Sequence, residues 1–474
     1  MGGTLFLDTF AFVLPAALLL LSILPSAVFP SPVFAEDLTP AVSRDSYTQE
    51  VRPDAKDDKG ELAVTDGLAI VTERSNLVRV AAYNPEIASA DVDAARAGFY
   101  PSIDASVGEA RLFYQPGAIF GSVQVPMANK SSFSYAISIK QTIYDFGAIM
   151  ARYKESMLSA DTARLDLDRT KNLVALNYLY ACFDLLETEK MILVAQTEIK
   201  QLRSHKDTAG HLYEEGAITK NDLLAAGVKL SDAVSRLLSL KNQRELYASR
   251  INSLLMKPLP GPLLLVDDTP ALSYIVTIEE YWLRAEKDRI ELKVADLQTE
   301  GLTLEEKIKK AGYYPKFYVL GGFSFAQNDY QVHEDNWSIF VGADVNLFNG
   351  GRTKAEVARV RHSMARTADE RKRILDDIRL EVQKSYLELK NSAEKLDATA
   401  EAVTQGEENL RITRARYEEG EGTATEVLDA IALKTLADTN HYRAMFDYKR
   451  ARAALLYSSG TDVAREYATH VDNR

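Results

Sequence analysis

The chain of 474 residues carries 56 Lys and Arg against 68 Asp and Glu, which gives a formal net charge of -12 at pH 7. This acidic balance, without a basic stripe, argues against nucleic-acid binding, because phosphate recognition depends on clustered Lys and Arg. The one cysteine, Cys182, has no second cysteine with which to form an intramolecular disulfide. It lies in an apolar helical run and is interpreted as a packing residue.

The residue patterns also argue against an enzyme. The 6 histidines are scattered without a His-x-x-x-His pair. The sequence contains neither a Gly-rich phosphate loop nor a Gly-x-Ser-x-Gly elbow. We therefore expect no catalytic site, no metal site and no cofactor.

The amino-terminal residues 1–35 predict a secretory signal peptide. An apolar stretch is followed by a segment with Pro and Ser that ends in Val33-Phe34-Ala35, although Asp8 stands where Lys or Arg is usual. The alternative is a transmembrane anchor. Pro15 and Pro25 argue against it, because they leave an apolar run shorter than the roughly 18 to 20 residues that a spanning helix needs. The polar, charged residues 36–65 predict an amino-terminal extension.

The two halves of the chain repeat each other at a fixed offset. Tyr213-Glu-Glu-Gly216-Ala-Ile-Thr219 recurs 204 residues later (417 - 213) as Tyr417-Glu-Glu-Gly420-Glu-Gly-Thr423. The same offset relates Asp222-Leu223-Leu224 to Glu426-Val427-Leu428. These matches predict an internal two-fold sequence repeat. The repeats would occupy residues 66–257 and 277–460, with a Pro-rich linker at 258–276 and a carboxy-terminal tail at 461–474.

Each half has the same order of predicted elements. A helix, 67–98 or 277–311, leads to a Tyr-Pro pair and then to apolar and polar residues in alternation. Alternation with a period of two predicts one β-hairpin in each half, at 101–144 and 315–348, with one apolar and one polar face. The connections at 114–131 and 326–336 are predicted to be exposed loops.

The longest predicted elements are helices that follow the hairpins. Residues 148–213 contain no proline, and a helix of about 65 residues extends ~100 Å at 1.5 Å per residue. No compact domain holds such a helix, so we expect an elongated coiled coil. The shorter helices 221–257 and 277–311 are expected to stack end to end beside it. Helices 425–458 and 67–98 are expected to do the same beside the second long helix.

The predicted fold class is mainly α with a small β part. Four strands are too few to close a barrel, for which about eight is the usual minimum, and open sheet edges are not tolerated in lipid. Cyclic trimerisation would solve this problem. It predicts a homotrimeric β-barrel, with four strands per protomer, continued by a long α-helical coiled-coil barrel. The alternative is an amphipathic sheet that packs on its own helices in a soluble protein.

From about residue 66 to 465 the chain resembles the TolC-like outer-membrane efflux and type I secretion channels. The resemblance rests on the two helix–hairpin–helix halves, the Tyr-Pro strand entries and the paired Tyr-x-x-Gly tips. It implies a homotrimer in the outer-membrane lipid of a Gram-negative bacterium, with a large periplasmic part. Its expected partners are a periplasmic adaptor (a membrane fusion protein) and an inner-membrane pump or ABC transporter. The implied function is a passive exit duct for small-molecule efflux or type I protein secretion.

The Tyr-x-x-Gly tips are predicted to be tight turns between helices, because Gly accepts a left-handed backbone and Thr219 or Asn221 can cap the returning helix. The resemblance implies that the adaptor also docks at these tips. The predicted docking residues are Tyr213, Gly216, Thr219, Tyr417, Gly420 and Thr423.

The acids that follow the tips are candidates for a periplasmic entrance. Glu426 and Asp429 are three apart on one helical face, so a threefold assembly would place rings of carboxylates there. Such rings favour cations; the alternative is an ordinary solvated acidic face. The resemblance implies a gate formed by Asp222, Tyr417, Glu426 and Asp429. In some family members an arginine completes this gate, but Gly422 occupies its position, so the closing network is expected to differ.

Two other functions remain open at this stage. One is an elongated periplasmic or surface coiled-coil scaffold without pore activity, and the other is an enzyme with an unrecognised site. The paired amphipathic hairpins favour the channel, because a scaffold does not need them.

Overall fold

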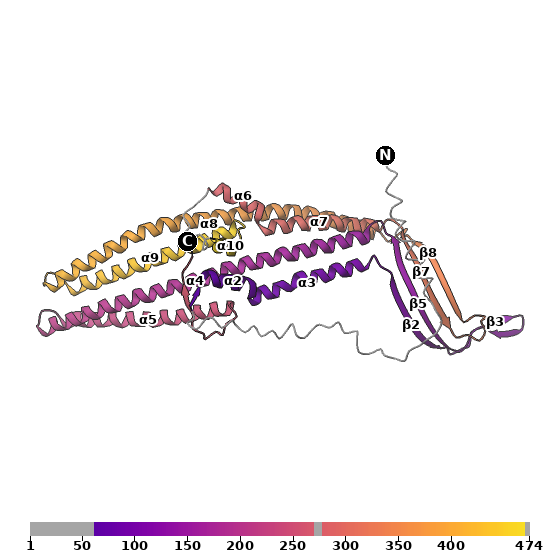
Figure 1. Ribbon diagram of the computed structural model, residues 1–474, viewed down its shortest axis with the longest axis horizontal. Helices are drawn as coiled ribbons and strands as arrows, with labels where there is room; N and C mark the ends of the chain where they lie inside the picture. Colours follow the sequence, from indigo (N-terminus) through magenta and orange to yellow (C-terminus); the bar gives the residue numbers. More distant parts are fainter. Residues whose placement is uncertain (1–60, 270–276, 470–474) are drawn as a thin grey trace. The chain divides into compact units, whose positions relative to one another are not determined.

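The structure is a computed structural model that describes residues 61–269 and 277–469. The predicted signal peptide and most of the predicted extension lie outside these residues. The described chain is mainly α with a small β part, as predicted (Figure 1). Its elements are β1 (Glu61–Ala63), α2 (Val64–Arg74), α3 (Asn76–Ala97), β2 (Ser102–Arg111), β3 (Gly117–Phe120), β4 (Val123–Pro126), β5 (Ser131–Tyr144), α4 (Ala148–Glu214), α5 (Lys220–Leu254), β6 (Leu264–Val266), α6 (Ile278–Asp288), α7 (Ile290–Ala311), β7 (Lys316–Ala326), β8 (Asp335–Asp344), α8 (Arg352–Glu418), α9 (Ala424–Ser458) and α10 (Val463–Thr469).

The long helices α4 and α8 each contain 67 residues, and the returning helices α5 and α9 each contain 35. These equal lengths are what the 204-residue offset predicts. Both long helices begin after a left-handed glycine, Gly147 (φ 82°) or Gly351 (φ 84°). At α4 the carboxylate of Asp145 accepts the backbone N–H groups of Gly147, Ala148 and Ile149 at 2.8 to 3.1 Å. These bonds satisfy amide groups that the first helical turn leaves unpaired.

Two of the predicted helices are each interrupted by a single residue. The helix expected at 67–98 breaks at Ser75, whose hydroxyl accepts the N–H of Val78 at 3.3 Å and caps α3. The helix expected at 277–311 breaks at Arg289, whose backbone is extended. The buried guanidinium of Arg289 pairs with Glu291 and Glu381, each at 2.9 Å. A polar contact therefore fixes each break.

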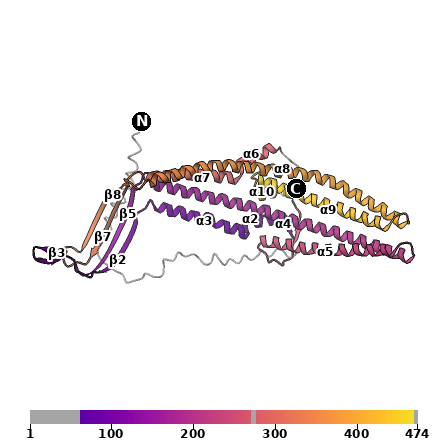
Figure 2. The ribbon, with the colours of Figure 1, turned by 180° about the vertical axis from the view of Figure 1, so that it is seen from behind.

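The predicted stacking of the short helices is wrong for α2 and α3, which were expected beside α8, and for α6, which was expected beside α4. Within the chain α2 and α3 pack against α4 rather than α8, α6 packs against α8, and α7 contacts both α4 and α8 (Figures 1 and 2). The reason lies in the sheet. Strands β2 and β5 pair antiparallel, so α3, which precedes β2, and α4, which follows β5, must lie side by side.

The four long strands form one antiparallel sheet in the order β2-β5-β7-β8. One face is apolar: Tyr135 stacks on Phe325 with ring centroids 5.0 Å apart, and Phe323 contacts Trp337 at 5.1 Å. This face is uncovered, with Trp337 70% and Ile339 80% exposed. The alternative of a sheet packed on its own helices is therefore wrong for the described chain.

The segment 114–131, predicted to be a loop, contains a small additional hairpin. Strand β3 pairs with β4 in a separate two-stranded sheet. Gly121 at its turn has a φ of 63°, which a glycine adopts without steric cost.

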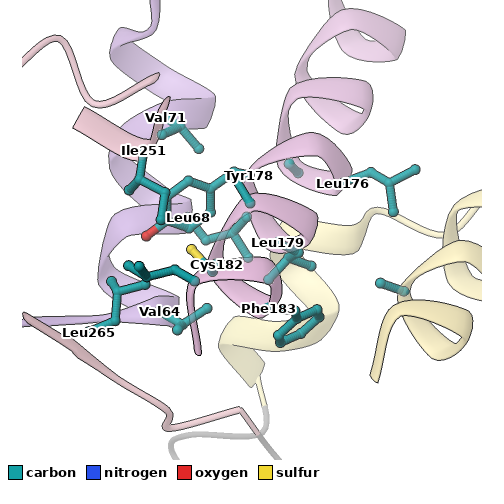
Figure 3. Packing of buried hydrophobic residues seen from close by; sticks show 14 of the residues in the cluster. Val64, Leu68, Val71, Leu176, Tyr178, Leu179, Cys182, Phe183, Ile251 and Leu265 are labelled. Atoms are coloured by element: carbon teal, nitrogen blue, oxygen red, sulfur yellow. The ribbon is translucent and has the colours of Figure 1, made fainter. Parts of the chain in front are cut away.

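The main core surrounds the middle of α4, from Val174 to Leu186. Figure 3 shows side chains of α2, α4, α5 and β6 pointing toward one another there. Cys182 is fully buried in this core, which confirms its interpretation as a packing residue. Burial raises the pKa of its thiol to about 12, so the thiol stays protonated at neutral pH.

Segments of the predicted extension, linker and tail take part in this core. Residues 61–65, assigned to the extension, form β1 and the start of α2, and β1 pairs in parallel with β6 of the predicted linker. The predicted tail contains α10, whose Val463 and Tyr467 are buried in the same core. Each segment is short, so its burial depends on contacts that are distant in sequence.

No helix among the described residues is both long and apolar enough to cross a membrane.

We expect Gly67→Ala to destabilise the core by about 1–3 kcal/mol, because the new methyl group would overlap the hydroxyl of Tyr178. The double variant Gly67→Ala/Tyr178→Phe should recover part of this loss, since the nearest ring atom, Cζ, then lies 2.7 Å away. Thermal unfolding followed by circular dichroism measures both effects. Gly301→Ala on α7 has open space around it and is the control; equal midpoints for the Gly67 and Gly301 variants would contradict the prediction.

Candidate functional site at the helix tips

The first tip joins α4 to α5 through a glycine turn. Gly216 has a φ of 77°, and its N–H donates to the carbonyl of Tyr213 at 3.0 Å. The N–H of Ala217 donates to the carbonyl of Leu212 at 2.8 Å. These bonds satisfy carbonyl groups at the end of α4, as a left-handed glycine cap does.

The second tip, between α8 and α9, has the same construction. Gly420 has a φ of 80°, and its N–H donates to the carbonyl of Tyr417 at 3.1 Å. The N–H of Glu421 donates to the carbonyl of Arg416 at 2.8 Å. Both predicted turns therefore form, and each follows a helix that spans ~100 Å from the sheet end.

Two of the candidate gate acids take part in capping boxes. The N–H of Thr219 donates to the carboxylate of Asp222 at 3.1 Å, and the Thr219 hydroxyl accepts the N–H of Asp222 at 3.4 Å. Thr423 and Glu426 repeat this pair, with both distances at 3.2 Å. Thr219, rather than Asn221, is thus the cap of α5. Asp222 and Glu426 stabilise the starts of their helices whatever else they do.

The two tip tyrosines occupy different environments although their motifs match. Tyr213 is 40% exposed, whereas Tyr417 is only 3% exposed. The ring of Tyr417 lies 5.2 Å from that of His205 on α4. It belongs to a cluster that joins the two helical hairpins and whose buried members are Ile199, Leu202, Ala233, Leu410, Tyr417, Ala424, Val427, Ala430 and Ile431.

The structure brings Tyr417 and Asp222 near each other across the two hairpins. Burial, followed by the negative charge of Asp222, raises the pKa of the Tyr417 hydroxyl above its ordinary value. That hydroxyl has no hydrogen-bond partner within the described part of the chain. Glu426 and Asp429 are both exposed at the tip, and the carboxylate of Glu426 is also held by the N–H of Thr423.

Gly422 stands where the resemblance implies an arginine in some family members, and the structure shows how this position is packed. A Cβ atom at this position would lie 3.2 Å from the backbone nitrogen of Tyr417 and 3.3 Å from the Glu426 carboxylate. The turn is therefore closely packed where the arginine would stand. Arg416 instead donates to the carbonyl of Glu421 at 3.1 Å and secures the turn from the side of α8.

The sequence patterns did not single out His205, whose ring contacts that of Tyr417, or Arg414, which precedes Tyr417 by three residues on α8. His205 continues the apolar spacing of Ile199, Leu202 and Ala209 on one face of α4, and this spacing indicates burial. A histidine on such a face was therefore a signal available in the sequence. Within residues 61–269 and 277–469, no group of three or more His, Cys, Asp or Glu could hold a metal ion.

We expect Gly216→Ala and Gly420→Ala each to destabilise a tip by about 1 kcal/mol, because a residue with a Cβ is strained in the left-handed region. Both sites have open space around them, so strain is the only cost. Gly210→Ala, in the helical part of α4 and equally unobstructed, is the matched control and should stabilise the protein slightly. Thermal unfolding distinguishes them; a loss at Gly210 as large as at Gly216 would contradict this assignment.

Comparison with known proteins places this chain in a family. A family model described as "Outer membrane efflux protein" matches residues 69–255 and 284–461. Nodulation protein T of Rhizobium leguminosarum bv. trifolii is 20% identical over 386 residues, which cover 79% of this chain and 80% of that protein.

Two solved structures have the same fold. The outer-membrane channel OprN aligns with a TM-score of 0.74 at 16% identity, over 85% of this chain and 90% of its own. The Campylobacter jejuni CmeC outer membrane channel aligns with a TM-score of 0.71 at 14% identity, over 95% of this chain and 97% of its own. The tips, the paired hairpins and the family match agree: the chain belongs to the outer membrane efflux protein family, the family of TolC-like export channels.

Proposed function

We propose that this protein is the passive outer-membrane exit duct of a tripartite export system and works as a homotrimer. The observation that carries the proposal is the four-stranded sheet, which has two unpaired edges, β2 and β8, and an uncovered apolar face. Both features are unfavourable in a solvated monomer, because apolar surface and free strand edges promote association.

Pairing of β8 of one copy with β2 of the next removes both edges and closes a barrel around a threefold axis. The apolar face then meets lipid and the opposite face lines the lumen. The side chains on the apolar face are exposed and large, namely Ile103, Val107, Tyr135, Ile137, Trp337, Ile339 and Val341. The opposite face carries small or polar residues such as Asp104, Ser138 and Ser338, which suit a water-filled passage, and larger side chains (Tyr318, Leu320 and Phe340) at the end nearer the helices.

In this proposal the long helices form a periplasmic tunnel, and the tips are its far end. The turns at Gly216 and Gly420 are exposed and lie one full helix length from the sheet. A periplasmic adaptor docks there, at Tyr213, Gly216 and Thr219 of the first tip and at Tyr417, Gly420 and Thr423 of the second. The adaptor links the duct to an inner-membrane pump or ABC transporter. The pump selects the cargo, so the same duct serves small molecules or secreted proteins.

The entrance of the duct is formed by Asp222, Tyr417, Glu426 and Asp429. Because Glu426 and Asp429 are exposed on one face of α9, a threefold axis repeats them as rings of carboxylates. Such rings attract cations and bind divalent ions more tightly than monovalent ones.

We expect Glu426→Gln/Asp429→Gln to abolish block by divalent cations and to reduce cation selectivity. Glutamine still accepts the N–H of Thr423, so the capping box is kept while the charge is lost. Single-channel conductance of the detergent-purified trimer in a planar bilayer, at several divalent cation concentrations, measures both quantities.

Glu418→Gln/Glu419→Gln removes equal charge beside the same tip and is the control, because these acids lie at the end of α8. Block that persists in the first variant, or is lost equally in both, would refute the carboxylate rings but leave the duct. Folded trimers that never form pores would refute the duct and favour a periplasmic or surface coiled-coil scaffold.

A further inference from the structure

Three buried polar atoms near the second tip have no hydrogen-bond partner within the described part of the chain. The atoms are Nε2 of His205 on α4, Nη2 of Arg414 and the hydroxyl of Tyr417, both of α8. His205 is only 4% exposed, and its ring contacts that of Tyr417. The cluster lies on the seam where hairpin α4–α5 packs against hairpin α8–α9. We call it the seam cluster.

The charge environment of the seam cluster opposes protonation of His205. Burial comes first and the positive charge of Arg414 second; together they hold the pKa of the imidazole below its ordinary value. In the described part of the chain, Arg414 is the one charged group that acts on this pKa. From α5, Asp222 acts on Tyr417. From α9, Glu426 is held by Thr423 at the cap. Among the described residues, no carboxylate is therefore seen to raise the pKa of His205.

The seam cluster can be compared with the matching positions of the other repeat through the offset of 204 residues. This offset relates Tyr417 to Tyr213, His205 to Asn409, and Arg414 to Gly210. Tyr213 and Asn409 are both exposed in the single chain, as expected for the matching seam that only a second copy can complete. The titratable residue is thus present in the seam within a chain, and asparagine stands at the matching position of the seam that the proposed trimer would form between chains.

We propose that His205 is a pH-sensitive latch that holds the two helical hairpins of one chain together at the tip. The neutral imidazole packs under Tyr417 and keeps the seam closed. A proton adds a second cation beside Arg414 in a buried site, which favours a loosened seam in which both groups reach water. The latch deepens the proposed function, since it would let external acid loosen the entrance of the duct. The loosening itself is a property of the fold and does not require a pore.

The direction of the pH dependence follows from linkage. In the loosened state His205 is solvated and titrates near its ordinary pKa of about 6.5; in the packed state its pKa is lower. Packing is therefore fully stable above about pH 6.5 and weakens as the pH falls toward the packed-state pKa. The ratio of packed to loosened tips falls by up to about tenfold per pH unit over that window.

The test is amide hydrogen exchange of the full, detergent-purified protein at pH 7.5 and pH 5.0, corrected for the intrinsic pH dependence of exchange. In the wild type we expect segments 199–212 and 410–431 to lose protection at pH 5.0, while the main core around 174–186 keeps it. His205→Asn installs the residue that the other repeat carries, and it should remove the pH response. His205→Gln is a second variant, in case asparagine disturbs folding.

His211→Asn is the matched control, because His211 lies on the same helix but is exposed, and this variant should keep the wild-type response. Arg414→Gln should reduce the acid-induced loss, since it removes the repelling charge. The latch is overturned if the wild type shows no loss at the tip, or if the folded His205 variants lose protection as the wild type does. Conductance at both pH values is measured separately: absence of pores overturns the duct, whereas the exchange data alone decide the latch.

Discussion

Burial of the middle of α4 is the constraint on which the rest of the chain depends. A helix of 67 residues gains little from its own propensity and must be stabilised by packing along an apolar face. Residues 174–186 carry the densest such face, and α2, α5, β6, α9 and α10 all contribute to covering it. The segments that cover it come from both ends of the described chain. The amino-terminal region, the connection between the repeats and the carboxy-terminal helix are thereby fixed to one another.

The same constraint explains why two repeats of equal length have different surroundings. The offset relates Leu176 and Phe183 of α4 to Leu380 and Leu387 of α8. The first pair is buried in the main core, whereas the second pair is exposed. On α8 the buried cluster around Val382 is covered by α6, α7 and α9 of the same chain. Leu380 and Leu387 lie outside that cluster and stay exposed, and the proposed trimer would bury them against a neighbouring copy.

At the tips, the residues of one short motif, Tyr-x-x-Gly-x-x-Thr with an acid three residues later, stabilise the turn in different ways. The glycines permit the turn, the threonines cap the returning helices, and the acids three residues later complete the capping boxes. A conservative substitution such as Glu426→Gln therefore removes the charge and keeps the capping hydrogen bond. Substitution by alanine would remove both the charge and the capping hydrogen bond. The two tip tyrosines differ in their exposure. Tyr417 is buried because it packs against His205 of the same chain, whereas Tyr213 is exposed.

The sequence by itself determined the long elements of this protein. Period-two alternation gave the four strands of the main sheet, proline-free apolar spacing gave the long helices, and the Tyr-x-x-Gly-x-x-Thr motif gave both turns, because each is a local property of the backbone. The family resemblance was also readable from these motifs. Tertiary structure alone decided which helices lie beside α4, the parallel pairing of β1 with β6, the burial of α10, and the contact of His205 with Tyr417. These four features depend on contacts between residues far apart in the chain. A short segment such as 61–65 or 463–469 has no sequence pattern that predicts which distant surface it packs against.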